Sequence, residues 1–375
     1  MSPTLPRRST FAAFTLTLLG ACTATADAPL REPRASRPHG SLLAIGGGLD
    51  DDQRDVFVRF LELARGRTGT PHIVVVTAAS GDQDDMATGK IAALRTWRPG
   101  LRCVVVKRET PTADTVAAID AATGLFFTGG DQKRIVERYR PGDAESPEWL
   151  AMQRLLDRGG VIAGSSAGLA MMGHTMLLGG SSAEALGTDG QPANPRVGPG
   201  MHFLPDVVTD SHFFERDRIG RLAAALVTTK APLGLGISED GCVEIDLERG
   251  TATGIGTAEA LVVDVRAANT TASSVRGARA MRLPRGATVD LRGLAAGTPA
   301  PAPARPRGEP LVEPYVEEGQ NRQLASWRVF ARASQDGCWL LEREGWRVVA
   351  WPAGGGEIAF DVTVGPPTEP SGTDR

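Results

Sequence analysis

The first part of the chain alternates short apolar runs with longer segments of mixed polarity. Four runs predict buried parallel strands, because they are rich in β-branched or aromatic residues and end in glycine or small polar residues. These runs are residues 42–45, 73–76, 104–106 and 125–127. The pattern predicts an α/β fold with a doubly wound, mostly parallel sheet and helices on both faces. Ligands of such sheets bind beyond the carboxyl ends of the strands, so the residues that follow each run are candidates for a functional site.

A fifth run, residues 161–163, leads into Gly164-Ser165-Ser166-Ala167-Gly168, and an apolar helical segment follows. A Gly-x-Ser-x-Gly turn between a strand and a helix can expose the serine hydroxyl as a nucleophile. The N-terminus of the helix then supplies amide donors for a developing oxyanion. The pattern alone is equally typical of an ordinary glycine-rich turn, because the chain has 45 glycines among 375 residues.

His212 is the candidate base for this serine. It is one of five histidines and none follows it, whereas the base of an α/β-hydrolase usually lies far downstream of the serine. The order therefore favours a sheet like that of class I glutamine amidotransferases or flavodoxin, with serine in place of cysteine. Asp210 and Glu239 compete to orient His212, and the sequence leaves both open. The alternative is that His212 simply packs beside Phe213 and Phe214.

Taken together, these motifs resemble the cyanophycinase and dipeptidase E family of serine peptidases. The family shows Gly-[Thr/Ser]-Ser-Ala-Gly, followed by Asp-Gln-His-Phe-x-x-Arg-x-Arg-x-x-Arg-Leu. The second pattern is matched by Asp210, His212, Phe213, Arg216, Arg218, Arg221 and Leu222. Ser211 stands where the family usually has glutamine. The resemblance covers roughly residues 40–292 and is nearer to the cyanophycinase branch.

Two further groups of residues are candidates for binding the substrate. The amides of Gly130 and Ala167 would form an oxyanion hole, and Asp131 and Gln132 would hold the substrate, unless Asp131 only caps a helix. Asp210 and three arginines form the second group, which suits a carboxylate-rich ligand. The arginines are Arg216, Arg218 and Arg221. A helix over residues 219–227 would place Arg218 and Arg221 on one face; the alternative is a solvated cluster that Glu215 and Asp217 neutralise.

The resemblance implies an exported serine exopeptidase that hydrolyses cyanophycin, a multi-arginyl polyaspartate, to β-Asp-Arg dipeptides through an acyl-enzyme. Ser166 would be the nucleophile, His212 the base and Glu239 the acid that orients it. Two alternatives are an aspartyl dipeptidase of the dipeptidase E type and a surface lipoprotein that binds without cleaving. No cofactor and no metal are expected. A net charge of −3 argues against a nucleic acid partner, and a homodimer is left open.

The N-terminus predicts export. Arg7-Arg8, the apolar stretch 11–19 and Leu19-Gly20-Ala21-Cys22 are typical of a lipoprotein signal peptide over residues 1–22, with Cys22 as the lipid anchor. The protein would then be held at the outer membrane, in the periplasm or at the cell surface. The alternative is ordinary secretion after cleavage nearby. Residues 23–38 would form a tether.

The remaining chain predicts a catalytic domain, a linker and a small module. These span residues 39–293, 294–312 and 313–375, and the linker is rich in proline. The module holds four of the six tryptophans, and its run 338–351 predicts two strands around a tight turn. It would stand alone or pack on the main domain. Cys103 is expected to be buried in a strand, and Cys242 and Cys338 would pair only if their regions touch.

Overall fold

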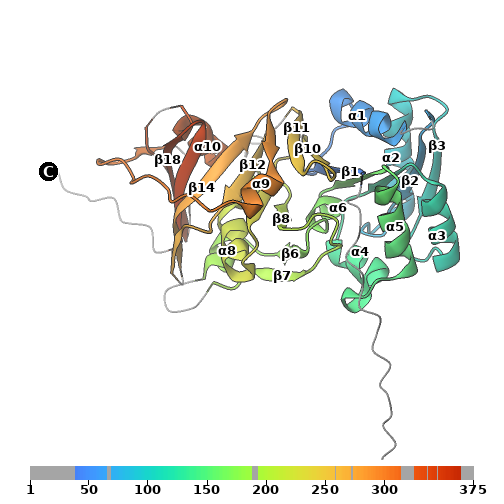
Figure 1. Cartoon of the computed structure of the whole chain (residues 1–375), viewed down its shortest axis with the longest axis horizontal. Coiled ribbons are helices and arrows are strands. Elements are labelled where there is room, and N and C mark those ends of the chain that lie inside the picture. Colours follow the sequence, from blue (N-terminus) through green and yellow to red (C-terminus); the bar gives the residue numbers. More distant parts are fainter. Residues whose placement is uncertain are drawn as a thin grey trace, which may run out of the picture. The chain divides into compact units, whose positions relative to one another are not determined.

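Figure 1 shows the computed structural model of the chain. It describes residues 39–65, 69–187, 193–257, 259–271, 273–313, 325–335, 337–343 and 345–364. The predicted signal peptide, Cys22 and the predicted tether lie outside these residues. Within the described ranges, no helix is both long enough and apolar enough to cross a membrane.

Eight strands form the first sheet, in the order β15-β11-β10-β1-β5-β4-β2-β3. Its parallel half consists of β1 (Ser41–Ile45), β2 (His72–Val76), β3 (Arg102–Val106), β4 (Gly124–Phe127) and β5 (Val161–Ser165). These are the five strands that the apolar runs predict. β10 (Gly241–Asp246), β11 (Thr251–Gly256) and β15 (Thr288–Asp290) pair antiparallel at one edge. Ile45 pairs with Ser165, so the chain leaves β1 and β5 at the same edge of the sheet.

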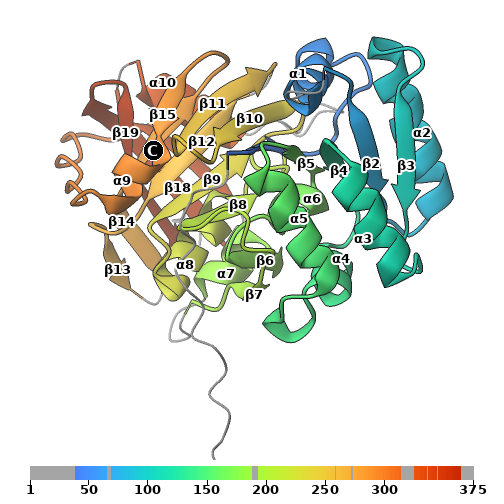
Figure 2. The ribbon, with the colours of Figure 1, turned by 45° about the vertical axis from the view of Figure 1, so that its right-hand side comes forward.

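Helices cover both faces of this sheet, as predicted. α1 (Arg54–Arg65) and α2 (Gln83–Trp97) pack on one face, where the rings of Phe60 and Phe126 lie 5.5 Å apart. On the other face lie α3 (Thr112–Ala121), α4 (Gln132–Tyr139) and α5 (Pro147–Asp157), which Figure 2 shows side by side. Ser146 caps α5 by accepting from the Trp149 amide, and proline begins the helix. The predicted α/β class is therefore confirmed.

A second, mostly antiparallel sheet was not predicted. Its order is β16-β17-β18-β19-β14-β12-β9-β8, and β13 (Asn269–Thr271) pairs with β14. One end of this sheet consists of β8 (Val207–Asp210), β9 (Leu233–Ile237), β12 (Ala260–Asp264) and β14 (Ser274–Leu283). α8 (Ile219–Thr229) and α10 (Ala325–Ala333) pack against this sheet. Between β5 and β8 in sequence come α6 (Ala167–Ala170), α7 (Ser182–Leu186) and the two-stranded β6 (Thr175–Gly179) and β7 (Arg196–Pro199). The short helix η1 (Pro141–Asp143) lies earlier, between α4 and α5.

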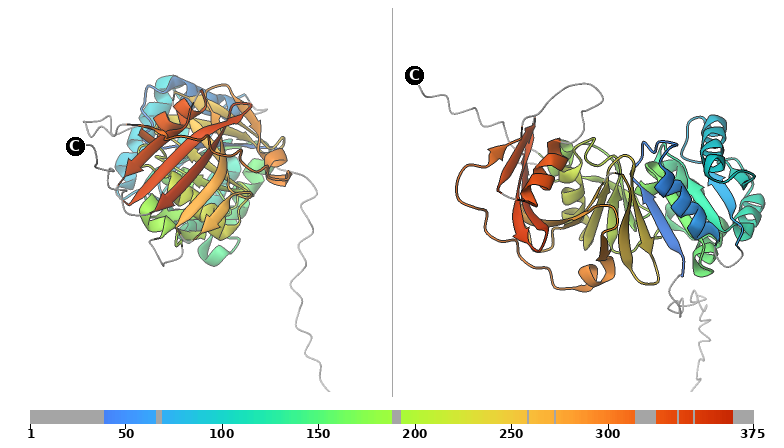
Figure 3. Two further views of the ribbon diagram at one scale, coloured as in Figure 1. Left: turned by 90° about the vertical axis from the view of Figure 1, so that its left-hand side faces the viewer. Right: turned by 90° about the horizontal axis from the view of Figure 1, so that it is seen from above.

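The C-terminal strands extend the second sheet. β17 (Trp339–Arg343) and β18 (Trp346–Gly354) form the predicted hairpin, and β19 (Glu357–Val364) joins it to β14, with Ala278 opposite Phe360. Figure 3 shows these strands as part of the same sheet as β14, with β19 next to it. β16 (Leu311–Val312) lies at the outer edge. Of the two arrangements left open by the sequence, the structure has this segment packed on the main domain.

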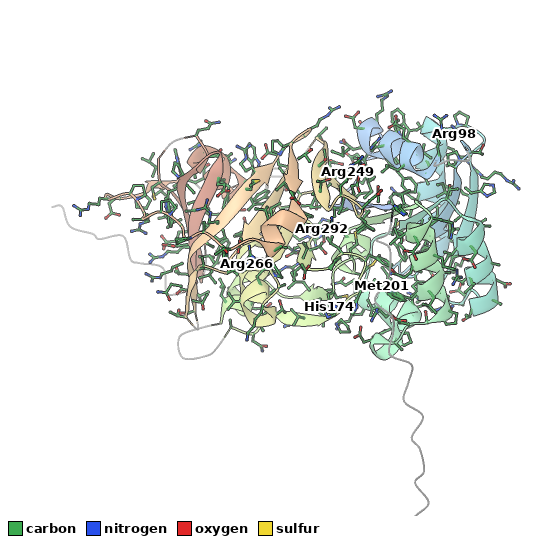
Figure 4. The ribbon with its side chains drawn as sticks, in the orientation of Figure 1. Arg98, His174, Met201, Arg249, Arg266 and Arg292 are labelled. Atoms are coloured by element: carbon green, nitrogen blue, oxygen red, sulfur yellow. The ribbon has the colours of Figure 1, made fainter. Side chains whose placement is uncertain are left out.

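The segment between the two parts is also anchored. The boundary predicted at residue 293 falls inside α9 (Leu291–Ala296). Arg266 donates to the Leu294 and Ala295 carbonyls of α9, and Arg292 of α9 donates to the Leu247 carbonyl; both arginines are labelled in Figure 4. In the proline-rich stretch, the Pro303 carbonyl accepts from Trp351 Nε1 at 3.1 Å. α9 is thus held next to both sheets, and the proline-rich stretch is held against β18 of the second sheet.

The three described cysteines are free thiols. Cys242 is buried in β10, but Cys103 is only partly buried, which corrects the expected burial. The reason is that β3 lies at the edge of the first sheet. Cys242 and Cys338 do not pair, because Cys242 lies in β10 of the first sheet and Cys338 directly precedes β17 of the second.

Candidate active site

Ser166 lies at a sharp turn between β5 and α6. Its φ of 53° and ψ of −105° are unusual for a residue with a side chain, which indicates stored backbone strain. The glycines around it are sterically required. A Cβ on Gly164 would lie 2.1 Å from the Gly168 carbonyl oxygen, and one on Gly168 would lie 2.7 Å from that of Phe127. The turn therefore has the strand-turn-helix context that the Gly-x-Ser-x-Gly motif requires.

His212 bridges Ser166 and Glu239. Its Nε2 lies 2.8 Å from Ser166 Oγ, and its Nδ1 lies 2.5 Å from Glu239 Oε1. We call residues 211–218, which follow β8, the base turn, and residues 238–240, which follow β9, the acid turn. Of the two acids that the sequence left open, the structure brings Glu239 to His212. The arrangement is that of a nucleophile, a base and an orienting acid.

The loop after β1 shapes the space around this triad. Gly46 accepts from the His212 amide at 2.7 Å through its carbonyl. A Cβ on Gly47, where φ is +105°, would lie 2.4 Å from His212 Cε1. One on Gly48 would lie 2.9 Å from Glu239 Oε2. The glycines thus allow the backbone to approach both side chains closely.

Burial lowers the pKa of His212 below its usual value. The neighbouring charges of Arg216 and Arg218 lower it too, while the hydrogen bond to Glu239 opposes the shift. A lowered pKa leaves the imidazole neutral at neutral pH, and only a neutral imidazole can accept the proton of a serine hydroxyl.

The loop after β4 lies beside the nucleophile. A Cβ on Gly129 would be 3.9 Å from Ser166 Oγ. Gly130 has a φ of +138°, and a Cβ there would meet the Ala79 carbonyl oxygen at 2.2 Å. No described residue accepts a hydrogen bond from the Gly130 amide, and Ala167, as the first residue of α6, has no acceptor within its helix. Both amides remain candidates for an oxyanion hole.

Asp131 and Gln132, expected to hold substrate, make internal contacts. Asp131 caps α4 by accepting from the Lys133 amide, which is the alternative considered from the sequence. Gln132 Nε2 donates to the Leu177 carbonyl at 2.6 Å. Both contacts fix the start of α4, and a role of these two side chains in holding the substrate stays a prediction.

Asp210, Arg218 and Arg221 form an internal ion-pair cluster. Arg221 Nε donates to Asp210 Oδ2 at 2.7 Å, and both residues are buried. Arg218 Nη1 donates to the Ser211 carbonyl at 2.5 Å and lies 3.4 Å from Asp210 Oδ1. Burial lowers the pKa of Arg218 to about 10, so it stays charged at neutral pH. The expected substrate contacts of these three residues are thus replaced by contacts to one another.

Arg216 differs from the other two arginines. It is exposed, and its charge acts on His212. It is the one arginine of the motif whose side chain is exposed to solvent.

Glu215 is a residue that the sequence reasoning did not assign to the site. Its Oε2 is buried and has no hydrogen-bond partner among the described residues. Burial is the largest cause that raises the pKa of Glu215 to about 7, and the charge of Glu239 raises it further. The sequence signal was its position in the base turn, where it was interpreted only as a counter-charge for the arginines.

Nowhere in the described ranges does a group of His, Cys, Asp and Glu side chains suit a metal ion.

Comparison with known proteins places this site in a family. The model of peptidase family S51 matches residues 42–252, which include Ser166, His212 and Glu239. This chain belongs to peptidase family S51. It is accordingly a serine-type peptidase, a hydrolase, as the sequence motifs predicted.

Two relatives show how far the likeness extends. The cyanophycinase of Nostoc sp. is 30% identical over 231 residues, which cover 57% of this chain and 69% of that protein. The cyanophycinase of Synechococcus elongatus is 30% identical over 236 residues, covering 60% of this chain and 69% of that protein. Among solved structures, a peptidase from an acI-B1 actinobacterium is 17% identical, with a TM-score of 0.49, over 68% of this chain and 97% of that one.

Proposed function

We propose that this S51 peptidase is an exported exopeptidase that hydrolyses cyanophycin to β-Asp-Arg dipeptides through an acyl-enzyme. The observation that carries the proposal is the pair of contacts made by His212, 2.8 Å to Ser166 Oγ and 2.5 Å to Glu239 Oε1. The substrate is suggested by the cyanophycinases of which this chain is a relative.

The acylation step uses the triad directly. Ser166 Oγ attacks the scissile carbonyl carbon while His212 Nε2 takes the hydroxyl proton. Glu239 accepts a hydrogen bond from the Nδ1 proton, which holds the ring in the required tautomer and stabilises the imidazolium. The amides of Gly130 and Ala167 would bind the oxyanion. Collapse of the tetrahedral intermediate breaks the C–N bond, and His212 gives its proton to the leaving amine.

The deacylation step repeats this chemistry with water. His212 takes a proton from a water molecule, the hydroxide oxygen attacks the acyl carbon, and Ser166 leaves as the alcohol with the proton from His212. The products are a carboxylic acid and the free enzyme.

Substrate recognition rests on Arg216 in this proposal. A guanidinium group binds carboxylates through two parallel hydrogen bonds, and Arg216 is exposed beside the base. An aspartyl dipeptidase of the dipeptidase E type would use the same contact, so it is the second candidate function. A surface lipoprotein that only binds has no need of an activated serine, and the Ser166–His212 contact disfavours that alternative.

Export is proposed from the N-terminal sequence alone. Residues 1–22 have the features of a lipoprotein signal peptide, and Cys22 would carry the lipid. Labelling of the protein by palmitate, lost in Cys22→Ser, tests this proposal. An unlabelled wild-type protein would leave ordinary secretion as the route.

The substrate test uses the purified protein and insoluble cyanophycin. We expect the turbidity of the suspension to fall and β-Asp-Arg to appear in the soluble fraction by mass spectrometry. Ser166→Ala is the control that should leave the suspension turbid. Cleavage of α-aspartyl dipeptides with no loss of turbidity would favour the dipeptidase instead.

A further inference from the structure

Helix α10 lies outside the part of the chain that matches the S51 family, yet it contacts the base turn directly and is linked to the acid turn through Glu259. The family match ends at residue 252, whereas α10 spans Ala325–Ala333. The base turn carries His212, and the acid turn carries Glu239. The link of α10 to the base turn is direct and buried, whereas its link to the acid turn runs through Glu259 and is partly buried.

The first contact is polar. Ser326 Oγ donates to Asp217 Oδ1 at 2.8 Å, and both side chains are buried. Asp217 has a φ of 47°, a left-handed conformation that is strained for a residue with a side chain. Its carbonyl also accepts from Ser182 Oγ at 2.6 Å. Ser326 therefore helps to hold the end of the base turn in an unfavourable backbone conformation.

The second contact is a row of four phenylalanine rings. The ring centroids of Phe213 and Phe214 are 5.1 Å apart, those of Phe214 and Phe330 6.3 Å, and those of Phe330 and Phe360 5.4 Å. All four side chains are buried. Phe213 directly follows His212 in the chain. The packing of α10 and β19 thus reaches the residue next to the catalytic base.

The third contact leads to the acid turn. Trp327 Nε1 donates to Glu259 Oε2 at 3.3 Å, and Arg282 Nε donates to the same oxygen at 2.7 Å. Ser334, just after α10, accepts from Arg282 Nη1 at 2.9 Å. The Glu259 carbonyl in turn accepts from the amide of Ser238, the neighbour of Glu239. One helix is therefore linked to both turns.

We propose that α10 is a positioning element of the active site. Ser326, Trp327 and Phe330 hold the base turn and the acid turn so that His212 reaches Ser166 and Glu239 at once. A displacement of about 1 Å caused by a change far from the chemistry can lower a rate by about 100-fold. The inference rests on the proposed function, because it takes Ser166, His212 and Glu239 as the reacting unit.

The test measures how fast Ser166 of the full chain reacts with a fluorophosphonate probe, which needs an activated serine but no natural substrate. Ser326→Ala removes the donor to Asp217, and Thr363→Val, its control, removes a hydroxyl that Arg347 binds in the C-terminal strands. Trp327→Phe and its control Trp351→Phe each lose one indole hydrogen bond, to Glu259 and to the Pro303 carbonyl.

We expect Ser326→Ala to slow the reaction by about 10-fold or more and Trp327→Phe by about 3-fold, with both controls within about 2-fold of wild type. With a peptide substrate, the loss should fall on kcat rather than KM. Melting temperatures of all four variants separate this effect from lost stability. If Ser326→Ala does not fold, the reaction rate of Trp327→Phe alone tests whether α10 positions the active site.

Test variants that react as fast as their controls would overturn the role of α10. A wild-type protein that the probe does not label at all would contradict the proposed function, and with it this inference.

Discussion

The turns that carry Ser166 and His212 both place a residue with a side chain at positive φ, 53° and 46°, but they are built differently. The Ser166 turn is held mainly by its neighbours: Gly164 and Gly168 approach closely, and the Ser166 carbonyl accepts from the Leu169 and Ala170 amides. The base turn is held by distant segments. Its contacts include Gly46 after β1, Ser182 in α7 and Ser326 in α10.

This difference separates what a short motif can specify from what requires the whole fold. The nucleophile turn is shaped mainly by Gly164 and Gly168, although the Ser166 amide also donates to the Ile45 carbonyl in β1. The base turn requires contacts across more than 100 residues of sequence, such as that between Asp217 and Ser326. Changes far from the site should therefore affect the base more than the nucleophile.

The largest expected effect comes from removing either partner outright. Ser166→Ala and His212→Ala should each lower kcat by a factor of about 10⁴ or more, because each disables the same proton-transfer unit. The double variant should be little worse than either single one. Steady-state hydrolysis of cyanophycin measures this, with circular dichroism to show that the fold is retained. Full turnover by Ser166→Ala would remove Ser166 from the mechanism.

The same contrast explains how much could be predicted from the sequence. The five parallel strands and the helix that became α8 follow from local periodicity and were predicted with nearly the observed bounds. The second sheet was not, because its strands pair over long distances: β19 pairs with β14 across the proline-rich stretch. Periodicity along one segment does not reveal its partner.

The site, like the fold, could be predicted from the sequence only in part. The motif pointed to Ser166 and His212, and the fold then brought Glu239 rather than Asp210 to the imidazole. The roles expected for Arg218 and Arg221 failed for a physical reason. The motif shows that guanidinium groups are present. It does not show that Asp210, buried at the end of β8, already accepts their hydrogen bonds.

A substitution in the loop after β1 should damage the base turn alone. The Cβ of Gly47→Ala would lie 2.4 Å from His212 Cε1, so the imidazole must move, and kcat should fall by about 100-fold. Gly100→Ala is the control, because Gly100 also has a positive φ, +74°, but open space around it. Its cost should be limited to about 1 kcal/mol of stability. Equal kcat values for the two variants would show that His212 tolerates the crowding.

The arginines of the base turn should separate into a binding and a structural class. Arg216→Ala should lower kcat/KM on cyanophycin by about 10- to 150-fold, equivalent to about 1.5 to 3 kcal/mol, through weaker binding. Arg221→Ala should instead lower the free energy of unfolding by about 3 to 5 kcal/mol, because it leaves Asp210 buried without its main partner. Urea unfolding and kinetics on both variants check this. The reverse assignment would mean that Arg221 meets the substrate.

The smallest expected effect concerns Glu215, whose substitution should change how the stability of the protein depends on pH. The pKa of Glu215 is raised in the folded protein to about 7 from an ordinary value of 4.5. The folded state therefore holds a proton that the unfolded state has lost between these values, and wild type should lose stability as pH rises from about 4.5 to 7. Glu215→Gln, which stays neutral, should lack this loss. Parallel unfolding curves for both proteins across that pH range would contradict the raised pKa.

The most direct test of the account is to map where a fluorophosphonate probe attaches to the full chain. We expect one adduct, on Ser166, found by mass spectrometry of peptides, and a reaction slowed by about 100-fold or more in His212→Ala. An adduct on another residue, or an unchanged rate in His212→Ala, would contradict the claim that Ser166 is a nucleophile activated by His212.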